Sequence, residues 1–347
     1  MSVNDRPVID RWFLDHLACP RDHHAVRLDG LQLVCDGGHR YPIVEGVPVM
    51  LLDDAAATID VLPASLTAAT DAIDPTNLYL SSLSLSDDER QGIAALARQG
   101  SPIDPAVTYL IAATNGLMYK HLIGRLDRYP IPHLPLPAGN GRRLLDVGCS
   151  WGRWTIAASQ QGYEAVGIDP SLGAVMAARR AAAQLGRPTR YLVGDARHLP
   201  FRDATFDVVY SYSVIQHLSP PDARRSVTEM GRVLRRGGAA KVQMPTRFGL
   251  RCLYHQARRR FREPVNFEVR YWTLPELRRL FSVIDDDVRF EVDGYFGIGL
   301  QKADAPLMTP MLAAILRVSE ALKASSHVVR PLVWVADSVF VETVVRA

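Results

Sequence analysis

The chain has 347 residues, of which 48% are hydrophobic and 22% charged, the usual balance of a globular protein with a buried core. Its 40 basic and 37 acidic residues leave a net charge of only +3, which gives no global argument for a nucleic acid or an anionic membrane as partner. No run of about 18 apolar residues occurs, so we expect no membrane span. The N-terminus lacks the apolar run of a secretory signal, and four scattered cysteines make no disulfide framework, so we expect a cytoplasmic protein.

The first two parts of the chain differ in composition. Residues 1–54 contain short apolar runs broken by glycine, proline, histidine and aspartate, which is typical of a small β-rich module. Residues 55–140 are rich in alanine, leucine and serine and predict a helical connector, with helices over 87–98 and 107–128. The connector ends in a proline-rich linker, YPIPHLPLPAGNG (129–141).

Beyond the linker the pattern alternates between strand, turn and helix, which defines a third expected domain, residues 141–347. Its first five strands are predicted at RRLLDVG (142–148), YEAVGID (163–169), TRYLVGD (189–195), FDVVYSY (206–212) and AAKVQMP (239–245). These apolar runs, separated by helices, indicate a parallel sheet that is covered on both faces. The predicted fold class is therefore α/β, with a doubly wound, Rossmann-like sheet.

The most informative segment is a glycine turn that follows the strand ending at Asp146. Gly148 and Gly152 let the backbone approach a ligand at the carboxyl end of the strand, the usual binding crevice of open α/β sheets. The second strand ends in Asp169, where a carboxylate can accept hydrogen bonds from both hydroxyls of a ribose. The third strand ends in Asp195, which can meet an adenine amino group.

These residues and their neighbours resemble the class I SAM-dependent methyltransferases. The matching segments are LLDVGCSWG, GIDPS, GDARHLPF, FDVVYSYSVIQHL and VLRRGGAAKVQMP. The resemblance implies a seven-stranded sheet and S-adenosylmethionine (SAM) as cofactor. The SAM-binding residues that it implies are Asp146, Gly148, Cys149, Ser150, Gly152, Asp169, Pro170, Asp195, Ala196 and Ser211.

A Rossmann dehydrogenase would share the turn and the acidic residue after the second strand. However, the G-x-G-x-x-G fingerprint is absent, because three other residues separate Gly148 from Gly152. The carboxylate at Asp195 also fits a methyltransferase better. We therefore favour methyl transfer over hydride transfer.

The topology of this family also accounts for the rest of the chain. WTLPELRRLF (272–281) is expected to form the last major helix, VRFEVDGYFGIG (288–299) the sixth strand and DSVFVETVVRA (337–347) a final antiparallel strand. Residues 300–336 are then a helical insertion, with a helix around 309–324.

Methyl transfer from a sulfonium is an in-line displacement, in which alignment and desolvation supply much of the acceleration. A hydroxyl acceptor also needs a base, and the candidate is His217, just after the fourth strand. The alternative is that His217 only packs at the start of a helix. The expected acceptor is a small or medium organic molecule of natural-product, sugar or quinone type, methylated on oxygen.

Two further segments are candidates for acceptor binding. Residues 246–263, a lid-like insertion, contain six arginines, of which Arg258 and Arg259 could grip a carboxylate or phosphate. The alternative for this segment is a solvated helix face. The predicted helix 107–128, which carries Tyr119, could form a second wall of the acceptor pocket.

Residues 14–54 resemble the small zinc-ribbon domain that activates several tRNA, rRNA and protein methyltransferases, on the segments LACP, LVC and YPIVEGVPVML. That family has two C-x-x-C knuckles, whereas here the partners of Cys19 and Cys35 at that spacing are Asp22 and Gly38. We therefore expect a ribbon without zinc that docks against the catalytic domain or a protein partner. An alternative tetrahedral zinc set is Cys19, Cys35, His39 and one of His23 or His24.

Two other functions stay open at this point. The ribbon could dock a methyltransferase onto tRNA or another macromolecule, although the weak net charge and the lack of a basic, aromatic platform argue against nucleic acid. The chain could also be a scaffold that binds SAM without catalysis, against which the complete set of acidic and glycine residues argues.

Overall fold

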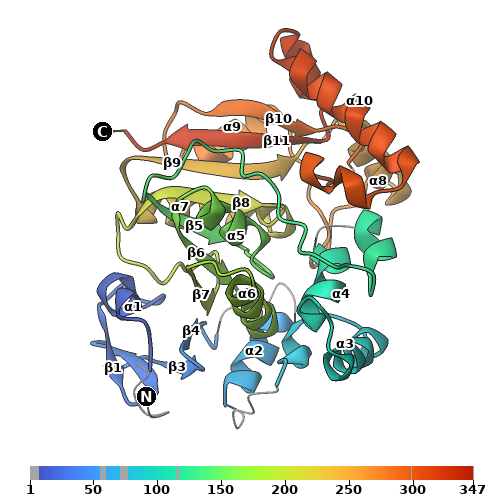
Figure 1. The fold of residues 1–347 in the computed structure, drawn as a ribbon. Helices are drawn as coiled ribbons and strands as arrows, with labels where there is room; N and C mark the ends of the chain where they lie inside the picture. Colours follow the sequence, from blue (N-terminus) through green and yellow to red (C-terminus); the bar gives the residue numbers. More distant parts are fainter. Residues whose placement is uncertain (1–7, 55–59, 71–76, 115–116, 298, 347) are drawn as a thin grey trace.

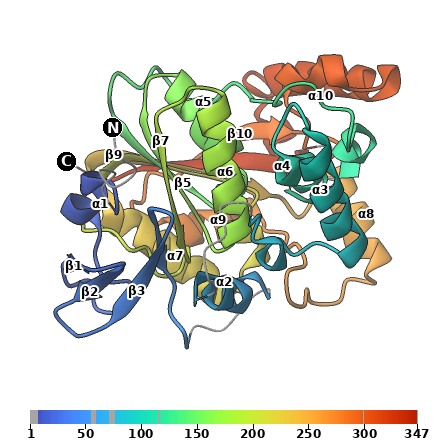
Figure 2. The same cartoon turned by 60° about the horizontal axis from the view of Figure 1, so that its bottom comes forward.

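The protein is described here by a computed structural model that covers residues 8–54, 60–70, 77–114, 117–297 and 299–346 (Figure 1). One sheet runs through these parts of the chain and joins its strands in the order β1-β2-β3-β4-β7-β6-β5-β8-β9-β11-β10. Helices pack on both faces of the sheet (Figures 1 and 2). None of the helices in the described ranges is long and apolar enough to cross a membrane.

Seven strands form the doubly wound sheet, and the predicted fold class is confirmed. Their bounds are β5 Arg143–Val147, β6 Glu164–Asp169, β7 Thr189–Gly194, β8 Phe206–Tyr212, β9 Leu234–Pro245, β10 Arg289–Gly294 and β11 Ser338–Val344. The pairs among β5 to β9 are parallel, and β11 runs antiparallel to both β9 and β10. The carboxyl ends of β5 to β10 therefore meet at one edge of the sheet.

The helices of this domain divide between the two faces. They are α5 Arg153–Gln160, α6 Leu172–Gln184, α7 Pro220–Val233 and α9 Leu274–Phe281. Buried residues of α6 join one apolar core, and buried residues of α7 and α9 join the core on the other side of the sheet. Caps set the helix starts: Ser171 accepts a hydrogen bond from Ala174 N, and Thr273 and Glu276 form a capping box.

The connector is helical, as its composition predicts. It contains α2 Val61–Thr70, the 3₁₀ turn η1 Leu80–Ser82, α3 Asp87–Gln99, α4 Pro105–Thr114 and η2 Leu117–Leu122. The single helix predicted over 107–128 is wrong in length, because α4 ends at Thr114, η2 is a 3₁₀ helix and residues 123–128 are not helical. Gly124 has φ +71°, which a right-handed helix does not allow. The expected start of the connector, residues 55–59, lies outside the described residues, as do 115–116 within this helix.

The C-terminal part departs from its prediction at one strand. The sixth strand, β10, is shorter than the predicted 288–299, because the chain turns after Gly294 with positive φ at Phe296 and Gly297; Ile298 lies outside the described residues. The remaining elements here are η3 Ile215–His217, α8 Leu250–Arg258, η4 Lys302–Leu307, α10 Pro310–Ser326 and η5 Arg330–Val335. The helix predicted around 309–324 corresponds to α10.

The N-terminal ribbon continues the doubly wound sheet. It comprises α1 Arg11–His16, β1 Val26–Asp29, β2 Gln32–Cys35, β3 Arg40–Val44 and β4 Val47–Met50. Strand β4 pairs in parallel with β7, with Met50 opposite Gly194 at the strand end that precedes Asp195. The α1 residue Trp12 packs edge-on against Phe201, in the loop that follows Asp195. The ribbon therefore packs against the loop that follows Asp195, at the carboxyl edge of the sheet.

Candidate functional site

The glycine turn after β5 has the backbone geometry that its sequence predicts. Gly148 has φ +77° and Gly152 φ +82°, and a Cβ atom on Gly148 would overlap the Val214 side chain. Ser150 also has a positive φ, +47°, which is uncommon for a residue with a side chain and is typical of functional sites. The backbone of the turn can therefore lie close to a ligand, and the Val214 side chain packs directly against Gly148.

Asp169 ties the turn to the end of β6. Its carboxylate accepts hydrogen bonds from Ser150 N and Ser171 N, both at 2.9 Å. Burial raises the pKa of Asp169 to about 6. A carboxylate has about four acceptor positions, so it can still accept ribose hydroxyls.

Other residues implied by the resemblance support the turn from below. Asp146 accepts a hydrogen bond from Thr155 Oγ1 at 2.6 Å, and burial raises its pKa to about 7. The Ser211 hydroxyl donates to Val147 O at 2.8 Å. Asp146, Gly152, Asp169 and Ser211 are not among the lining residues of the two cavities at the turn. In this structure these four residues therefore shape and support the turn and do not form the cavity walls.

Two cavities meet at Gly148. The first, about 80 Å³, is lined by Gly148, Pro170, Asp195, Ala196 and His217 among others, and α2 closes it with Val61 and Leu62. The second, about 70 Å³, is lined by Gly148, Cys149, Ser150, Trp151, Arg153, Trp154, Tyr212, Ser213 and Gly299. Both are smaller than the several hundred Å³ of typical ligand sites, so side chains at the mouth must move when a nucleoside enters.

The residues present fit a nucleoside cofactor with a polar tail. The first cavity offers the Asp195 carboxylate and the backbone at the carboxyl ends of β6 and β7. In the second, the Ser150 hydroxyl is buried without a hydrogen-bond partner among the described residues. A buried hydroxyl without a partner is unfavourable unless a ligand completes it.

Asp195 is already engaged with a cation. Its two oxygens accept hydrogen bonds from Arg197 Nε, both at 3.0 Å, and its Oδ1 also accepts from Arg197 N at 2.8 Å. This pairing fixes the orientation of the Asp195 carboxylate at the cavity wall. An adenine amino group would therefore have to use the acceptor positions that Arg197 leaves.

His217 lies on the wall of the first cavity. Its Nδ1 is 2.7 Å from Phe267 O, so Nδ1 carries the proton, and its ring stacks on the Phe267 ring at 3.9 Å. Burial lowers the pKa of His217 to about 4, with Arg270 acting in the same direction. His217 is therefore neutral near pH 7 and a weak base, because efficient bases have a pKa close to the working pH.

This low pKa predicts a pH dependence of stability. A histidine with a pKa of about 6.5 in the unfolded chain and about 4 in the folded one binds its proton preferentially when unfolded, so stability is lost as pH falls from 6.5 toward 4. Relative to His217→Gln, the native protein should lose on the order of 1–2 kcal/mol more between pH 7 and pH 5, after discounting for partial exposure. Urea unfolding at the two pH values measures this difference. An equal loss in both proteins would contradict the placement of His217.

A second polar cluster, missed by the sequence analysis, adjoins the second cavity. Tyr212 OH donates to Asp293 Oδ2 at 3.1 Å, Gln301 Nε2 donates to Tyr212 OH at 2.9 Å, and Ser338 Oγ donates to Asp293 Oδ2 at 2.9 Å. Burial raises the pKa of Asp293. Tyr212 and Asp293 also line a third cavity, of about 40 Å³. Asp293 is an acid near the end of the sixth strand, which is the signal that could have found it.

Tyr119 lies in the core and not on a cavity wall. The Arg153 guanidinium pairs with the Asp304 carboxylate, and Tyr119 OH donates to the same carboxylate oxygen. The Arg153 and Asp304 side chains are only 5% and 1% exposed. This buried group joins α5, η2 and η4, so the expectation that Tyr119 contacts the acceptor finds no support in its position.

The two candidate arginines of the insertion 246–263 lie apart from the two cavities at Gly148. Arg259 Nη1 donates to Val269 O at 3.0 Å, and Arg259 lines a cavity of about 360 Å³ with Arg247, Arg262 and Arg270. Arg258 is exposed at the end of α8. The lining of that cavity has no residue in common with the two cavities at Gly148.

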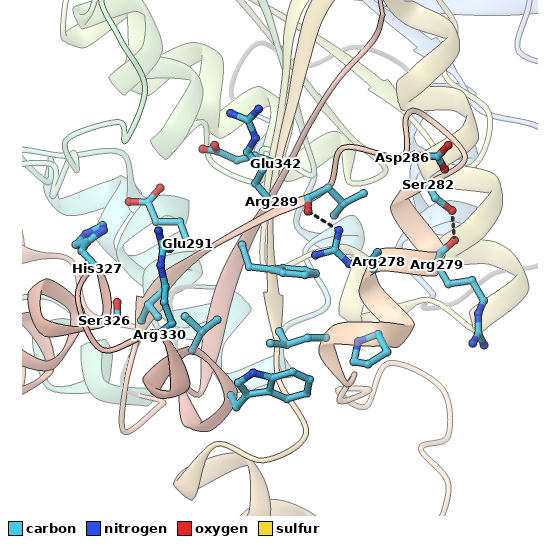
Figure 3. Close-up of a pocket in the computed structure, with 17 residues that line it drawn as sticks. Arg278, Arg279, Ser282, Asp286, Arg289, Glu291, Ser326, His327, Arg330 and Glu342 are labelled. Carbon is cyan, nitrogen blue, oxygen red and sulfur yellow. Dashed lines mark hydrogen bonds between the residues drawn. The ribbon is translucent and has the colours of Figure 1, made fainter.

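Cavity size does not identify the site. A cavity of about 1030 Å³ lies between α9, the edge strand β10 and the chain after α10, with Arg278, Arg289 and Arg330 around it (Figure 3). None of the residues at the glycine turn lines it. We therefore place the functional site at the small cavities, where the strand ends converge.

The ribbon brings four potential metal ligands together. The donor atoms of Cys19, Asp22, Cys35 and His39 lie within 4.8 Å of one another. His39 Nδ1 is 3.5 Å from Cys19 Sγ, 3.3 Å from Cys35 Sγ and 3.1 Å from Asp22 Oδ2. Donors on one tetrahedral zinc ion lie about 3.3–3.8 Å apart, so these four are of the right chemical kind for zinc and lie at or slightly inside that spacing. The fourth donor is Asp22 and neither His23, which faces Glu229, nor His24.

This donor set predicts zinc binding by chelator-treated protein. One zinc ion per chain is expected to raise the free energy of unfolding by about 2.7 kcal/mol when free zinc is 100-fold above its Kd. His39→Gln should abolish the stabilisation, whereas His24→Gln, in the same module, should retain it. Thermal unfolding with metal analysis measures both, and an equal effect of the two substitutions would show that the four donors do not act as a site.

Residues 144–238 match a protein family described as "Methyltransferase domain". An "Uncharacterized methyltransferase" of Mycobacterium sp. (strain KMS) is 40% identical over 100 residues, which are 29% of this chain and 37% of that protein. A "Ubiquinone biosynthesis O-methyltransferase" of Azorhizobium caulinodans is 33% identical over 98 residues, 28% of this chain and 35% of that protein. The chain thus spans little more than a third of these relatives.

Among solved structures, the YcgJ protein of Bacillus subtilis superposes with a TM-score of 0.41 at 20% identity. The superposition covers 60% of this chain and 94% of that one.

Proposed function

Residues 144–238 match a methyltransferase domain family, and we propose that the whole chain is a class I enzyme that transfers a methyl group from SAM to a small or medium organic acceptor. The observation that carries this proposal is the convergence of the Gly148 turn, Asp169 and Asp195 at one edge of the sheet. When bound, SAM supplies an electrophilic methyl group. Binding, alignment and proton removal then fall to the chain's own residues.

The two cavities suggest how the chain would hold the cofactor. Asp195 and Ala196 line the first cavity and would face the adenine. The Asp169 carboxylate lies behind this lining and would meet the ribose once side chains at the mouth move aside. The Ser150 hydroxyl and the turn would face the amino-acid end in the second cavity. The reacting end then lies close to Gly148, where the two cavities meet.

We propose an oxygen on an aromatic or quinone-type ring as the methyl acceptor. The second cavity has an aromatic wall, in which the Trp154 and Tyr212 ring centroids are 4.8 Å apart. Flat aromatic walls favour flat aromatic ligands through stacking. The named O-methyltransferase relative acts in ubiquinone biosynthesis, which is consistent with this class.

The base that a hydroxyl acceptor needs is better provided by Asp293 than by His217. His217 has a pKa of about 4, and its Nδ1–H donates a hydrogen bond to the Phe267 carbonyl. Burial instead raises the pKa of Asp293 above that of an ordinary aspartate, in the direction of the working pH. Tyr212 bridges Asp293 and the second cavity. In this scheme the acceptor oxygen gains the methyl group, and its proton passes by way of Tyr212 to the Asp293 carboxylate.

The direct test is transfer of label. Purified protein is incubated with methyl-deuterated SAM and extract of the source cells, and the products are analysed by mass spectrometry. A labelled small molecule is the expected result and would identify the acceptor. Label confined to RNA or protein would replace this proposal with macromolecular methylation. Absence of label, with SAM binding shown separately, would replace it with a scaffold.

The cofactor site makes its own prediction. Asp169→Asn should weaken SAM binding by about 10- to 100-fold, since hydrogen bonds to a charged group contribute roughly 1.5–3 kcal/mol. Glu164→Gln, an exposed acid at the other end of the same strand, should leave the Kd unchanged. Isothermal titration measures both. Unchanged SAM affinity in Asp169→Asn would rule out the ribose contact.

A further inference from the structure

Helix α8 presents its apolar side to solvent. Leu250, Leu253 and Tyr254 are 68%, 39% and 55% exposed, and with Ala257 they follow the spacing of one helix face. Cys252 is the buried residue of the helix. Helices on the surface of a globular protein normally bury the apolar face, so this orientation is inverted.

Polar contacts hold the helix in this orientation. The Asp337 carboxylate accepts hydrogen bonds from Arg251 N at 2.8 Å and Cys252 N at 3.0 Å. On the inner side, Gln256 Nε2 donates to Arg247 O, and Arg259 Nη1 donates to Val269 O. The outward direction of the leucine and tyrosine side chains is therefore built in by specific bonds. In both views α8 lies at the margin of the molecule (Figures 1 and 2).

Exposed apolar residues continue beyond the helix toward the cofactor cavity. Phe248 is 47%, Phe261 68%, Val265 55% and Phe267 46% exposed. Phe267 also lines the first cavity and stacks on His217. We name the exposed apolar residues of 248–267 the apolar rim. The rim leads from the margin of the molecule to the mouth of the site.

The segment that contains the rim is strongly basic. Residues 246–270 contain seven arginines and two glutamates, a net charge of +5, whereas the whole chain has +3. Arg262 pairs with Glu268 at 2.6 Å, but Arg258 and Arg260 are exposed and form no ion pair with the described residues. A basic helix with exposed apolar side chains has the chemistry of a helix that lies in a membrane interface.

We propose that the apolar rim docks this protein on an anionic lipid bilayer, with α8 in the plane of the interface. The apolar side chains enter the acyl boundary, and the arginines contact the lipid phosphates. The inference goes beyond the proposed reaction, and the binding does not depend on it. Docking would place the mouth of the first cavity, beside Phe267, at the membrane surface, where a lipophilic acceptor could enter.

Charge argues against a second copy of the chain as the occupant of this face. A two-fold dimer through the rim would bring the same patch of each copy together and place arginines opposite arginines. An anionic bilayer neutralises them instead, with a contribution of about 1 kcal/mol per arginine near the surface.

The test is sedimentation of the full chain with vesicles. We expect binding to phosphatidylcholine vesicles that contain about one third phosphatidylglycerol, weak binding to phosphatidylcholine alone, and release by salt. Arg258→Gln with Arg260→Gln should weaken binding by about 25-fold, at roughly fivefold for each charge. The control is Arg98→Gln with Arg187→Gln, which removes two exposed charges elsewhere and should leave binding unchanged.

A second variant separates insertion from charge. Leu250→Ser with Phe261→Ser should reduce binding while the net charge is unchanged. The proposal is overturned if the protein does not bind anionic vesicles, if both arginine pairs have the same effect, or if polyglutamate binds the rim and the vesicles do not. Concentration-dependent dimerisation that is lost in Leu250→Ser with Phe261→Ser would assign the rim to a second copy. Each readout is independent of methyl transfer, so failure here leaves the proposed function standing.

Discussion

Asp304→Ala is expected to destabilise the protein by about 3–5 kcal/mol, the effect of leaving a buried charge without its partner. Arg153 and Asp304 are almost completely buried, and Asp304 also accepts the hydrogen bond of the buried Tyr119 hydroxyl. Arg153 keeps only the carbonyl of Pro130 and the tyrosine oxygen when the carboxylate is removed. Because this group joins α5, the connector and the insertion, its loss should loosen all three.

Urea unfolding at pH 7 measures this effect. Replacing both partners by apolar residues, Arg153→Met with Asp304→Leu, should recover much of the lost stability, since no charge then stays buried. Asp287→Ala, which breaks an exposed pair with Arg289, should have no measurable effect. If the double variant is as unstable as Asp304→Ala, packing and not the unpaired charge explains the loss.

Asp293→Asn is expected to lower kcat by about 10²- to 10⁴-fold, the range for loss of a general base. The substitution keeps the shape of the side chain, and Tyr212 can still donate to its amide oxygen, but the proton acceptor is gone. Rates are measured as S-adenosylhomocysteine formed in source-cell extract, above extract alone. The affinity for SAM should stay unchanged, because Asp293 lies beyond the cavities at the turn.

The pH profile distinguishes a base from a structural role. The base must be ionised, so the native rate should rise with pH through the pKa of Asp293, which burial places above that of an ordinary aspartate. Asp293→Asn should lack this rise, Asp293→Glu should restore part of it, and Tyr212→Phe should slow the reaction without affecting SAM binding. Asp286→Asn, an exposed acid just before the start of β10, is the control. A native-like profile in Asp293→Asn would assign the base elsewhere, with His217→Gln as the next variant.

The doubly wound sheet and the position of the glycine turn follow from local sequence patterns. Strands such as RLLDV (143–147) are short apolar runs bounded by glycine or charge, and the signals for their ends lie within a few residues. Carboxyl ends of neighbouring parallel strands share one edge of the sheet. The order of the residues along the chain is therefore enough to bring Asp169 and Asp195 to the same edge.

Which residues far apart in the sequence come into contact could be seen only in the folded structure. Tyr212 and Asp293 are 81 positions apart, and Arg153 and Asp304 are 151 apart. No local pattern specifies such pairs, because they depend on the order of the last strands and on how the insertion folds back. The ribbon shows the same limit, since the sequence predicted a ribbon without zinc and offered His23 or His24 only in an alternative ligand set, whereas the fold brings Asp22 to Cys19, Cys35 and His39.

Helix α8 shows most clearly why local sequence patterns do not determine which face of an element is exposed. Its sequence predicts an amphipathic helix, and the usual assumption is that Leu250 and Tyr254 face inward. The Asp337 carboxylate, 86 residues from Arg251, instead holds the helix with its apolar face outward. Periodicity determines that a helix has two faces, but only the contacts made by the rest of the fold decide which face solvent, or a membrane, will meet.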